Sequence, residues 1–349
     1  MPPLATDDLD LILTHTRELW PELRGNNLFL AGGTGFFGCW LVDSFLWAND
    51  RLGSNASATA MTRDPESFAR KAPHLAGHSA LRLLQGNVRN FEFPAGEFPI
   101  MIHAATEASA SLARLDPLSM LDTVVAGTRH ALEFACRCGV RKFLLTSSGA
   151  VYGKQPGTAS HVTEDYPGGP FPEEPTSVYG EGKRMAELLC ALYASKYGFG
   201  CKIARCFAFV GPHLPLDTHF AIGNFIRDAM CGGPIQANGD GAPYRSYLYA
   251  ADLAIWLWTI LFRGAGCRPY NVGSENDLSI ADLAREVATA LNPAATVRIA
   301  KPSSPGQEPE RYVPSTKRAQ QELGLKEYVP IREAIRRTAI SYGYSDQST

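Results

Sequence analysis

Short apolar runs alternate with amphipathic stretches through the first 206 residues of the chain. The apolar runs predict strands at 28–31, 58–61, 81–85, 100–105, 142–146 and 201–206. The stretches between them predict helices, the longest at about 118–138 and 178–197. Since the strands are apolar on both faces, this alternation is typical of a parallel sheet covered by helices. We therefore expect an α/β fold with a Rossmann-type doubly wound parallel sheet.

The start of the chain and the region after residue 206 follow other patterns. Residues 6–23 predict an amphipathic helix, because Leu9, Ile12 and Leu19 fall on one stripe. After residue 206, loops rich in Gly and Pro alternate with short helices and strands. We expect a helical extension at 1–26, a dinucleotide-binding domain at 27–206 with about 245–272, and a smaller C-terminal substrate-binding lobe at about 207–244 and 273–342.

The composition is that of an ordinary globular protein, with 45% hydrophobic and 19% charged residues and a formal net charge of −2. With no basic excess, we expect no nucleic-acid partner and no attraction to an anionic membrane surface. The longest apolar run, Leu253–Phe262, is too short to span a bilayer. An acidic N-terminal stretch without a long apolar segment predicts no signal peptide. Eight scattered cysteines without paired spacings predict reduced thiols and no metal site, so we expect a cytoplasmic protein.

A glycine-rich segment, Gly32-Gly33-Thr34-Gly35-Phe36-Phe37-Gly38, follows the first strand and opens a helix that runs to about Trp47. In this setting glycines let the backbone turn tightly around a pyrophosphate, whose charge lies at the helix N-terminus. The segment therefore predicts a dinucleotide-binding turn formed by residues 32–38. A tight strand-to-helix turn without a ligand is the alternative.

The end of the second strand bears on which dinucleotide binds. The acidic residue that would hold the ribose 2′-hydroxyl of NAD is missing there, and the chain has Thr62 and Arg63 instead. An arginine at this place is suited to a 2′-phosphate, and a solvated loop residue is the alternative. Asn87, just after the third strand, is placed either to meet the adenine edge or simply to form a turn. We predict NAD as the cofactor, with NADP as the alternative.

Tyr179 and Lys183 lie four residues apart in the helix predicted at 178–197. This spacing puts a phenol and an ammonium on one helix face, about 6 Å apart. The ammonium then favours the phenolate and lowers the pKa of the tyrosine from about 10, which suits a general acid/base for a hydroxyl proton. Ser148 follows a strand and is expected at the carboxyl edge of the sheet, where doubly wound folds bind ligands. The structural alternatives are a surface lysine beside a half-buried tyrosine, and a serine that caps a turn.

Taken in order, these motifs resemble the extended short-chain dehydrogenase/reductases, and within them the nucleotide-sugar epimerase/dehydratase family. The resemblance runs from about residue 27 to 340. Besides the segments above, it is carried by His103-Ala104-Ala105, Gly127-Thr128, Arg205-Cys206-Phe207, Arg245-Ser246-Tyr247, Asp252-Leu253-Ala254 and Tyr270-Asn271-Val272-Gly273. It implies an NAD(P)-dependent enzyme that acts on a nucleotide-linked sugar.

The resemblance also implies roles for individual residues. Tyr179 is the acid/base, Lys183 binds the nicotinamide ribose, and Ser148 hydrogen-bonds the reacting sugar oxygen. Arg245 grips the nucleotide diphosphate, a role for which Arg311 is a weaker candidate. The other implied contacts are those of Val88, Ala104 and Ala105 to the cofactor and of Asn224, Phe225 and Glu107 to the substrate, with residues 106–109 and 213–219 lining the sugar pocket. Helices 118–138 and 178–197 resemble those of the family's dimer interface, which implies a homodimer.

The type of reaction depends on smaller differences. The family's dehydratases and glucuronate decarboxylases carry an acidic residue just after the catalytic Ser or Thr, whereas this chain has Gly149 and Ala150. Elimination needs an acid and a base at neighbouring carbons, so we expect C4 epimerisation through a transient 4-keto sugar. Against this, Tyr179-x-x-Gly182-Lys183-Arg184 resembles the decarboxylase branch. The alternatives are an NADPH-dependent 4-keto-sugar reductase, a dehydratase or decarboxylase, and a non-catalytic nucleotide-binding protein.

Overall fold

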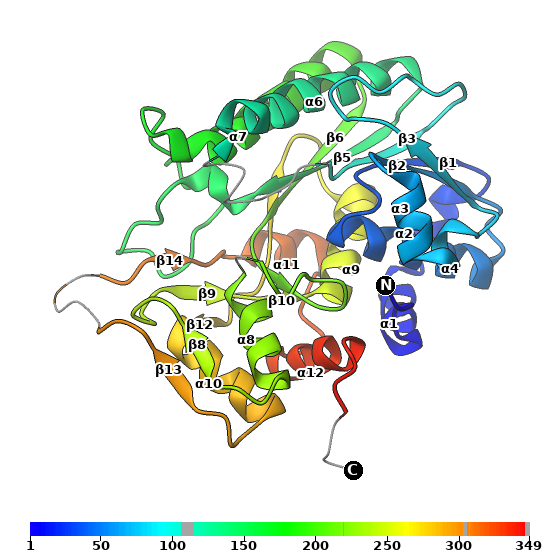
Figure 1. Ribbon diagram of the computed structural model, residues 1–349. Helices are drawn as coiled ribbons and strands as arrows, with labels where there is room; N and C mark the ends of the chain where they lie inside the picture. The colour runs from blue at the N-terminus through cyan, green and yellow to red at the C-terminus, as the bar shows by residue number, and fades with distance from the viewer. Residues whose placement is uncertain (106–114, 219, 303–305, 307, 346–349) are drawn as a thin grey trace. The chain divides into compact units, whose positions relative to one another are not determined.

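The structure is a computed structural model that describes residues 1–105, 115–218, 220–302, 306 and 308–345 (Figure 1). The chain divides into two compact units, each assembled from three segments. The first unit comprises residues 1–153, 169–206 and 254–270. The second comprises residues 154–168, 207–253 and 271–349. The extension expected at 1–26 is therefore part of the first unit.

The first unit is built on a seven-stranded sheet with the strand order β11-β6-β5-β4-β1-β2-β3. Its strands are β1 Asn27–Ala31, β2 Ser57–Thr62, β3 Leu81–Gln85, β4 Ile100–His103, β5 Lys142–Ser148, β6 Gly200–Cys206 and β11 Pro269–Val272. The ladders from β3 across to β6 are all parallel. The strand order reverses between β1 and β4, which is the switch point of a doubly wound sheet. The predicted α/β fold of the Rossmann type is confirmed.

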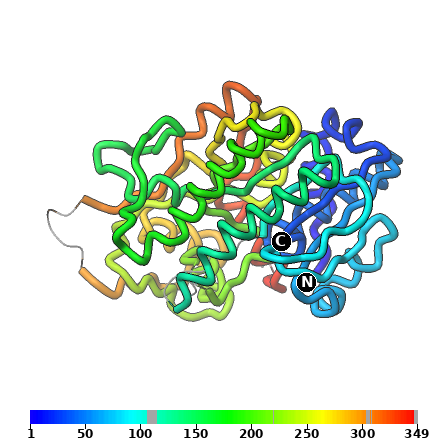
Figure 2. Tube along the Cα trace, turned by 90° about the horizontal axis from the view of Figure 1, so that it is seen from above, coloured from blue at the N-terminus to red at the C-terminus, as the bar shows by residue number. Residues whose placement is uncertain are grey.

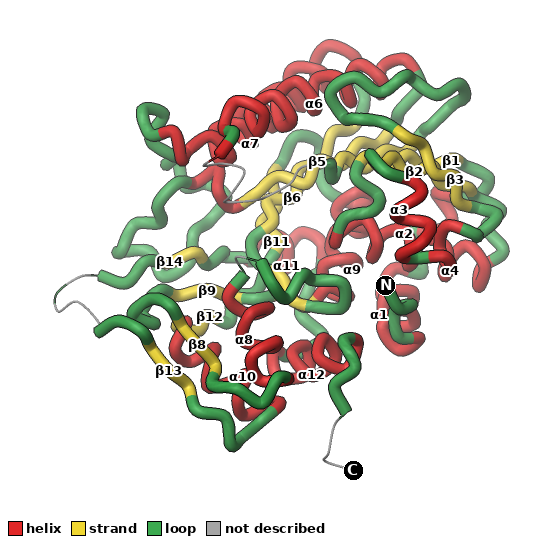
Figure 3. Tube along the Cα trace, in the orientation of Figure 1, coloured by secondary structure: helices red, strands yellow, loops and turns green. Residues whose placement is uncertain are grey.

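Helices cover both faces of this sheet (Figure 3). On one face lie α6, Pro117–Arg137, and α7, Val178–Tyr197, which run alongside each other (Figure 2). On the other face lie α2, Phe36–Leu52, and α9, Ala250–Arg263. The indole nitrogen of Trp258 in α9 donates to Ser44 Oγ in α2 over 3.0 Å. The apolar faces of both helix pairs are thus turned towards the strands, as the periodicity predicts.

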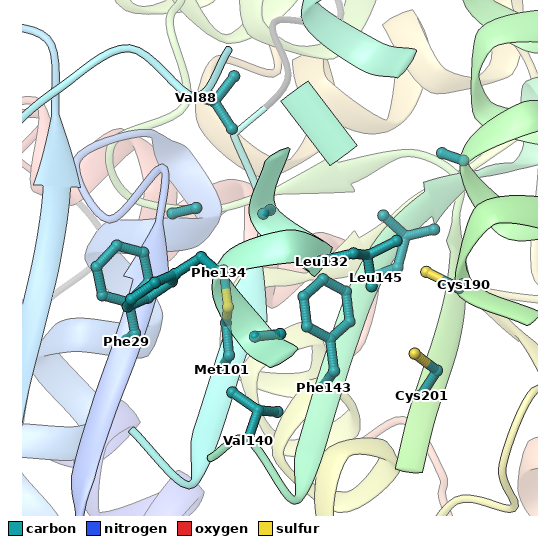
Figure 4. Close-up of a cluster of buried hydrophobic side chains, with 14 of the residues drawn as sticks. Phe29, Val88, Met101, Leu132, Phe134, Val140, Phe143, Leu145, Cys190 and Cys201 are labelled. Atoms are coloured by element: carbon teal, nitrogen blue, oxygen red, sulfur yellow. The ribbon is translucent and has the colours of Figure 1, made fainter. Parts of the chain in front are cut away.

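A packed aromatic and aliphatic core fixes the face under α6 and α7 (Figure 4). Phe29, Met101 and Phe143 come from β1, β4 and β5, and Leu132 and Phe134 come from α6; none is more than 1% exposed. The rings of Phe29 and Phe134 lie 4.9 Å apart between centroids. Each such side chain contributes about 1.5–3 kcal/mol by burial. This packed core therefore fixes the strands whose ends carry the candidate catalytic and cofactor-binding residues.

The N-terminal helix is shorter than the periodicity predicts. Helix α1 spans Thr6–Thr16, and a separate 3₁₀ turn follows at Trp20–Leu23, so the single helix expected at 6–23 is wrong. The cause is Pro21, which has no backbone N–H to donate to the Arg17 carbonyl and so cannot continue the α-helical hydrogen bonds. The break is held by Thr16, whose Oγ1 donates to the Ile12 carbonyl and accepts the Trp20 indole N–H over 3.0 Å.

The second unit consists of small sheets and helices. Its strands are β7 Phe209–Val210, β8 Ile235–Ala237, β9 Tyr244–Ser246, β10 Leu248–Tyr249, β12 Asp277–Ser279, β13 Val297–Ile299 and β14 Arg311–Tyr312. Its helices are α8 Ala221–Met230, α10 Ile280–Leu291, α11 Lys317–Leu323 and α12 Ile331–Ser341. Helix α10 lies against both α8 and α12. Strand β9 is the middle strand of the sheet β12-β9-β14 and carries Arg245.

The first unit also contains short helical elements. They are α3 Pro65–Lys71, α4 Pro73–Ala76 and the 3₁₀ turns Gly149–Tyr152 and Pro175–Ser177. Helix 178–197 and strand 81–85 agree with the prediction residue for residue, whereas β5 extends two residues further, to Ser148, and β4 ends two residues earlier, at His103. Within the residues that the structure describes, no helix has the length and apolarity needed to cross a bilayer.

Candidate active site

The turn between β1 and α2 brings backbone against backbone. Gly32 has a φ of 85°, and a Cβ there would lie 2.6 Å from the Ala104 carbonyl oxygen. A Cβ at Gly38 would lie 2.3 Å from the Gly32 carbonyl oxygen. Both positions therefore require glycine. Gly35 is the N-cap of α2 and supplies no side-chain cap, which is the arrangement of a helix N-terminus that binds an anion.

A pocket of ≈ 720 Å³ opens beside this turn in the first unit. Most of the predicted cofactor residues line it, namely Gly32, Thr34, Gly35, Phe36, Thr62, Arg63, Asn87, Val88, Ala104 and Ala105. Gly33, Phe37, Gly38, Tyr179 and Lys183 are not among its described lining residues. Gly33 instead serves packing, since a Cβ there would lie 2.6 Å from the Ala60 Cβ.

The same pocket is also lined by residues that the sequence pattern does not single out, among them Met61, Gly86, Arg89, Met120 and Thr123. They come from β2, the loop after β3 and α6, elements that only the fold brings to one place. A concave site with glycines beside an uncapped helix N-terminus fits the pyrophosphate of a dinucleotide.

Strand β2 itself carries no carboxylate. Asp64 is the nearest acid along the chain, but its Oδ1 accepts the Ser67 N–H over 2.8 Å and so caps α3. Thr62 Oγ1 accepts the Thr34 hydroxyl over 2.9 Å, which ties the strand end to the glycine turn. Arg63 is exposed at the pocket edge. The lining at this strand end thus combines the Thr62 hydroxyl and the Arg63 guanidinium with the Asp64 carboxylate, whose Oδ1 is already engaged.

The three catalytic candidates lie at neighbouring ends of β5 and α7. Ser148 is the last residue of β5, and its Oγ accepts the Ala150 N–H over 3.1 Å. Tyr179 lies in the first turn of α7. Lys183 Nζ donates to the Thr146 carbonyl over 2.7 Å and lies 5.8 Å from the centroid of the Tyr179 ring. The predicted proximity of phenol and ammonium is therefore present.

Burial dominates the electrostatics beneath these residues. Lys183 is 2% exposed, and burial lowers its pKa to about 8, against the opposing charge of Glu187. His103 is also buried, and burial together with the Lys183 charge lowers its pKa to about 3. Its Nε2 lies 3.0 Å from Thr128 Oγ1. A neutral His103 leaves Lys183 as the cation nearest the Tyr179 ring among these groups.

The two candidate diphosphate ligands lie on adjacent strands of the second unit. Arg245 in β9 donates to Glu310 Oε1 over 2.7 Å, and its guanidinium lies 5.8 Å from the Tyr312 ring centroid. Arg311 in β14 donates to Asp277 Oδ2 over 2.7 Å and lies 4.1 Å from the Tyr244 ring centroid. Both arginines are held in ion pairs over aromatic rings, so an incoming diphosphate competes with a carboxylate for each of them.

The remaining substrate candidates are less informative. Asn224 and Phe225 lie within α8; Asn224 Oδ1 accepts a weak bond from Arg227 over 3.4 Å, and Phe225 is buried in the second unit. Glu107 and residues 106–109 lie outside the described residues, as does position 219. His213 adopts a left-handed backbone conformation with a φ of 73°. The roles of these residues stay predictions.

One charged pair close to the catalytic candidates is not predicted from the sequence. Glu187 in α7 and Arg205 in β6 form an ion pair with an Nη2–Oε2 distance of 2.7 Å, and their side chains are 12% and 15% exposed. The available signals are a charged residue inside an apolar strand and a glutamate one helical turn after Lys183. Neither signal predicts by itself that Glu187 and Arg205 form an ion pair.

Residues 28–273, more than half of the chain, match the NAD dependent epimerase/dehydratase family. The chain belongs to this family. The glycine turn, Ser148, Tyr179 and Lys183 all fall within the matched range. The protein is therefore an NAD-dependent enzyme of the epimerase/dehydratase type, and the predicted family and cofactor are confirmed.

Relatives of this family member cover nearly the whole chain. UDP-glucuronic acid decarboxylase 3 of Arabidopsis thaliana is 29% identical over 323 residues, which make up 93% of this chain and 90% of that protein. UDP-glucuronic acid decarboxylase 1 of Xenopus tropicalis is 28% identical over 317 residues, 91% of this chain and 72% of that protein.

Solved structures of other members share the fold. The UDP-glucuronic acid 4-epimerase of Bacillus cereus, in complex with UDP-glucuronic acid and NAD, has a TM-score of 0.75 at 20% identity, covering 91% of this chain and 99% of that one. The dTDP-glucose 4,6-dehydratase of Streptomyces venezuelae, with NAD bound, has a TM-score of 0.75 at 23% identity, covering 91% and 97%. At such identities the likeness concerns the fold alone.

Proposed function

We propose that this enzyme epimerises a nucleotide-linked sugar at C4 through a transient 4-keto sugar. The observation that carries the proposal is a complete set of Ser148, Tyr179 and Lys183 without an acidic neighbour. The two residues that follow Ser148, Gly149 and Ala150, have no acidic side chain. Such a set serves removal and return of a hydroxyl proton. It contains no further acid next to the serine for the departure of water.

Each residue acts on a defined group. Tyr179 takes the proton of the C4 hydroxyl and later returns it to the same oxygen. Lys183 keeps the Tyr179 phenolate favourable by its charge, and Ser148 hydrogen-bonds the reacting oxygen. Bound NAD supplies the hydride acceptor and then the hydride donor. Return of hydride to the other face of the 4-keto sugar inverts C4.

The 3₁₀ turn after Ser148 is the feature that favours epimerisation over elimination. Gly149 and Ala150 begin this turn, and the Ala150 N–H is bonded to the Ser148 hydroxyl. Neither residue has a titratable group that could protonate a leaving hydroxyl. Since elimination needs an acid and a base at neighbouring carbons, the site is better suited to reversible oxidation at one carbon.

Decarboxylation of a nucleotide-linked glucuronate is the second candidate. It is supported by the relatives from Arabidopsis thaliana and Xenopus tropicalis, which are UDP-glucuronic acid decarboxylases. Gly182 and Arg184 around Lys183 also resemble that branch. Loss of CO₂ from a 4-keto acid needs no proton donor for a leaving hydroxyl, so this reaction is compatible with the same serine, tyrosine and lysine.

The test is incubation of the purified enzyme, without added cofactor, with UDP-, dTDP-, CDP- and GDP-linked hexoses and with UDP-glucuronic acid. We expect the C4 epimer at unchanged mass, and no turnover by Tyr179→Phe. A product lighter by CO₂ assigns the decarboxylase activity, and one lighter by water assigns a dehydratase. In a parallel incubation with NADPH and a 4-keto sugar, consumption of NADPH in proportion to product assigns a reductase. Each of these three results contradicts epimerisation.

Nucleotide binding is assigned to the second unit. Arg245 grips the diphosphate, because a guanidinium fork matches phosphate oxygens. Arg311, on the neighbouring strand, adds a second cation. The carboxylates of Glu310 and Asp277 that now hold these arginines are the groups that the diphosphate replaces.

The enzyme is proposed to be a homodimer. Helices α6 and α7 expose large apolar side chains, at fractions of 75% for Leu118, 51% for Leu188 and 55% for Leu192. Met185 of α7 adds a fourth, 45% exposed. A second copy of the same helix pair covers such a stripe by a self-complementary contact, as the family resemblance implies.

A further inference from the structure

A buried, two-pronged ion pair lies behind the catalytic candidates in the first unit. Arg205 Nη2 donates to Glu187 Oε2 over 2.7 Å, and Arg205 Nε donates to Glu187 Oε1 over 3.0 Å. Both side chains are less than one sixth exposed. The guanidinium fork thus meets the carboxylate in the geometry of the strongest charged hydrogen bonds.

Stability alone is a poor explanation for this pair. Removing two charges from water costs about as much as, or more than, their attraction returns, so an apolar pair of the same size is often as stable. What a bidentate pair adds is a fixed geometry between the two elements that carry it. Here those elements are helix α7, which carries Glu187, and strand β6, which carries Arg205.

The pair also binds the chain on both sides of Ser148. Glu187 Oε1 accepts the Ser147 hydroxyl over 2.5 Å, and Arg205 Nη1 donates to the Tyr152 hydroxyl over 2.9 Å. Ser147 directly precedes Ser148 in β5, and Tyr152 ends the 3₁₀ turn that Ser148 caps. The backbone before and after the candidate serine is therefore tied to one ion pair.

On the helix side, the pair follows the catalytic residues along one face of α7. Tyr179, Lys183 and Glu187 are spaced four residues apart, so they rise along the helix side by side. The first turn of α7 is pressed against the turn after Ser148, since a Cβ at Gly180 would lie 2.6 Å from the Ala150 carbonyl oxygen. Because the backbone is closely packed at Gly180, the contacts of Glu187 further along the helix fix how α7 lies along β5.

We propose that Glu187 and Arg205 are positioning residues, which lock α7 against the end of β5 so that Tyr179 and Ser148 reach the same substrate oxygen. The inference rests on the proposed roles of Ser148, Tyr179 and Lys183. Neither Glu187 nor Arg205 touches substrate in this scheme. They act by setting the distance between two hydroxyl groups that come from different elements.

The main test compares Glu187→Gln with wild type on the nucleotide sugar that the wild type turns over. Glutamine keeps the size and an acceptor for Ser147 but loses the charge that holds Arg205. We expect kcat to fall about tenfold to 100-fold, the loss typical of a misplacement near 1 Å, with KM and NAD affinity within about twofold. Arg205→Lys, which keeps the charge and loses the fork, is expected to lose kcat in the same way and to a smaller extent.

The matched control is Glu22→Gln. Glu22 pairs with Lys142, the first residue of β5, over 2.5 Å and also with Arg263; the Glu22 and Lys142 side chains are 35% and 26% exposed. This substitution removes an equal charge from a partly buried cluster of ion pairs at the opposite end of β5 from Ser148. We expect a lower melting temperature at most, and an unchanged kcat.

A pH profile tests whether the Glu187 charge acts on Lys183, separately from the geometry that kcat and KM report. Burial lowers the pKa of Lys183, and Glu187 is the charge that opposes this, since the pKa values of the Cys206 and Cys190 thiols are raised and both stay protonated. His103 stays neutral because burial lowers its pKa. Loss of the Glu187 charge lowers the pKa of Lys183 further, so the alkaline limb of kcat moves to lower pH. An alkaline limb that stays in place would show that the Glu187 charge does not act on Lys183.

The outcomes are distinguishable from failure of the proposed function. If Tyr179→Phe is inactive while folded Glu187→Gln keeps its kcat within about twofold and its alkaline limb, only the positioning role is overturned. If Tyr179→Phe remains active, the proposed chemistry itself fails. If Glu187→Gln does not fold, Arg205→Lys decides: a normal kcat in that variant overturns the inference, and a reduced kcat with unchanged KM supports it.

Discussion

The Lys183 ammonium lies 5.8 Å from the centroid of the Tyr179 ring while its Nζ donates to the Thr146 carbonyl over 2.7 Å. One contact places the charge beside the phenol, and the other ties it to the strand that ends in Ser148. The lysine is almost fully buried, which lowers its pKa to about 8. Burying this ammonium costs hydration free energy. Its retention at this place indicates that its position matters more than its contribution to stability.

The first prediction concerns stability and pH in Lys183→Met. Burial lowers the pKa of Lys183 in the folded protein to about 8, below its ordinary value of 10.5. Below pH 8 both states are protonated and the burial penalty is complete, whereas above it the folded protein loses the proton while the unfolded chain keeps it. Stability of wild type relative to Lys183→Met is therefore expected to rise with pH, by about 3 kcal/mol in all across this window.

Urea unfolding from about pH 7.5 to about pH 10 measures this difference. Lys196→Met, at the exposed end of the same helix, is the control, and its difference from wild type is expected to stay flat. A flat curve for Lys183→Met as well would show that the lysine is not buried as the structure has it.

The second prediction concerns the glycine turn. Alanine at Gly38 would place its Cβ 2.3 Å from the Gly32 carbonyl oxygen and 2.4 Å from the Gly33 carbonyl carbon, both of them backbone atoms that cannot move aside. We expect Gly38→Ala to lower stability by at least about 2 kcal/mol and NAD affinity by more than about tenfold, measured by thermal unfolding and calorimetry. Gly266→Ala, with nothing within 4 Å of its Cβ, is the control. Equal effects at both sites would contradict the close approach.

The third prediction concerns the choice of dinucleotide. Arg63 lines the cofactor pocket beside Thr62, and the nearby Asp64 carboxylate is engaged in capping α3. We expect Arg63→Ala to weaken NADP binding about tenfold more than NAD binding, because only NADP carries the 2′-phosphate that a guanidinium can grip. Arg51→Ala, on the exposed end of α2, should change neither. Equal losses for the two dinucleotides would remove Arg63 from the recognition of the phosphate.

How far the sequence predicts this molecule depends on the range of the interactions involved. Helix 178–197 and the glycine turn are predicted correctly because local spacing and glycine chemistry decide them. The single helix predicted at 6–23 is wrong because Pro21, which lies within the stripe of apolar residues, interrupts the helical hydrogen bonds. The extension of β5 to Ser148 depends instead on its ladder to β6, where Ser148 lies opposite Cys206.

The Glu187–Arg205 pair shows what local reasoning cannot reach. The two residues are 18 positions apart, on a helix and a strand, and they meet only because β5 and β6 pair with Ser147 opposite Arg205. Register of this kind follows from the whole sheet rather than from either segment. The lining of the cofactor pocket by Met120 and Thr123 of α6 has the same origin.

The fourth prediction concerns the dimer. Leu188 and Leu192 lie one helical turn apart and are both more than half exposed on α7. We expect Leu188→Lys combined with Leu192→Lys to convert the dimer into a monomer, because like charges and lost apolar burial would meet at a self-complementary contact. Analytical ultracentrifugation measures the mass and so distinguishes monomer from dimer. Ile340→Lys, equally exposed on α12, is the control and should leave the dimer intact. A wild-type monomer would dismiss the proposed assembly outright.

The last prediction concerns Glu310, whose carboxylate holds the proposed diphosphate ligand Arg245 over 2.7 Å while its side chain is 57% exposed. An exposed pair of this kind is worth about 0.2–1 kcal/mol, so removing the carboxylate frees the arginine for phosphate at little cost to the fold. We expect Glu310→Ala to bind UDP about twofold to fivefold more tightly by calorimetry, with the gain shrinking as salt rises. Glu286→Ala, which breaks the Arg332 pair on α10 and α12, should leave UDP binding unchanged. Unchanged or weaker binding in Glu310→Ala would mean that the carboxylate does not compete with the diphosphate, and that Arg245 serves the second unit as a structural residue.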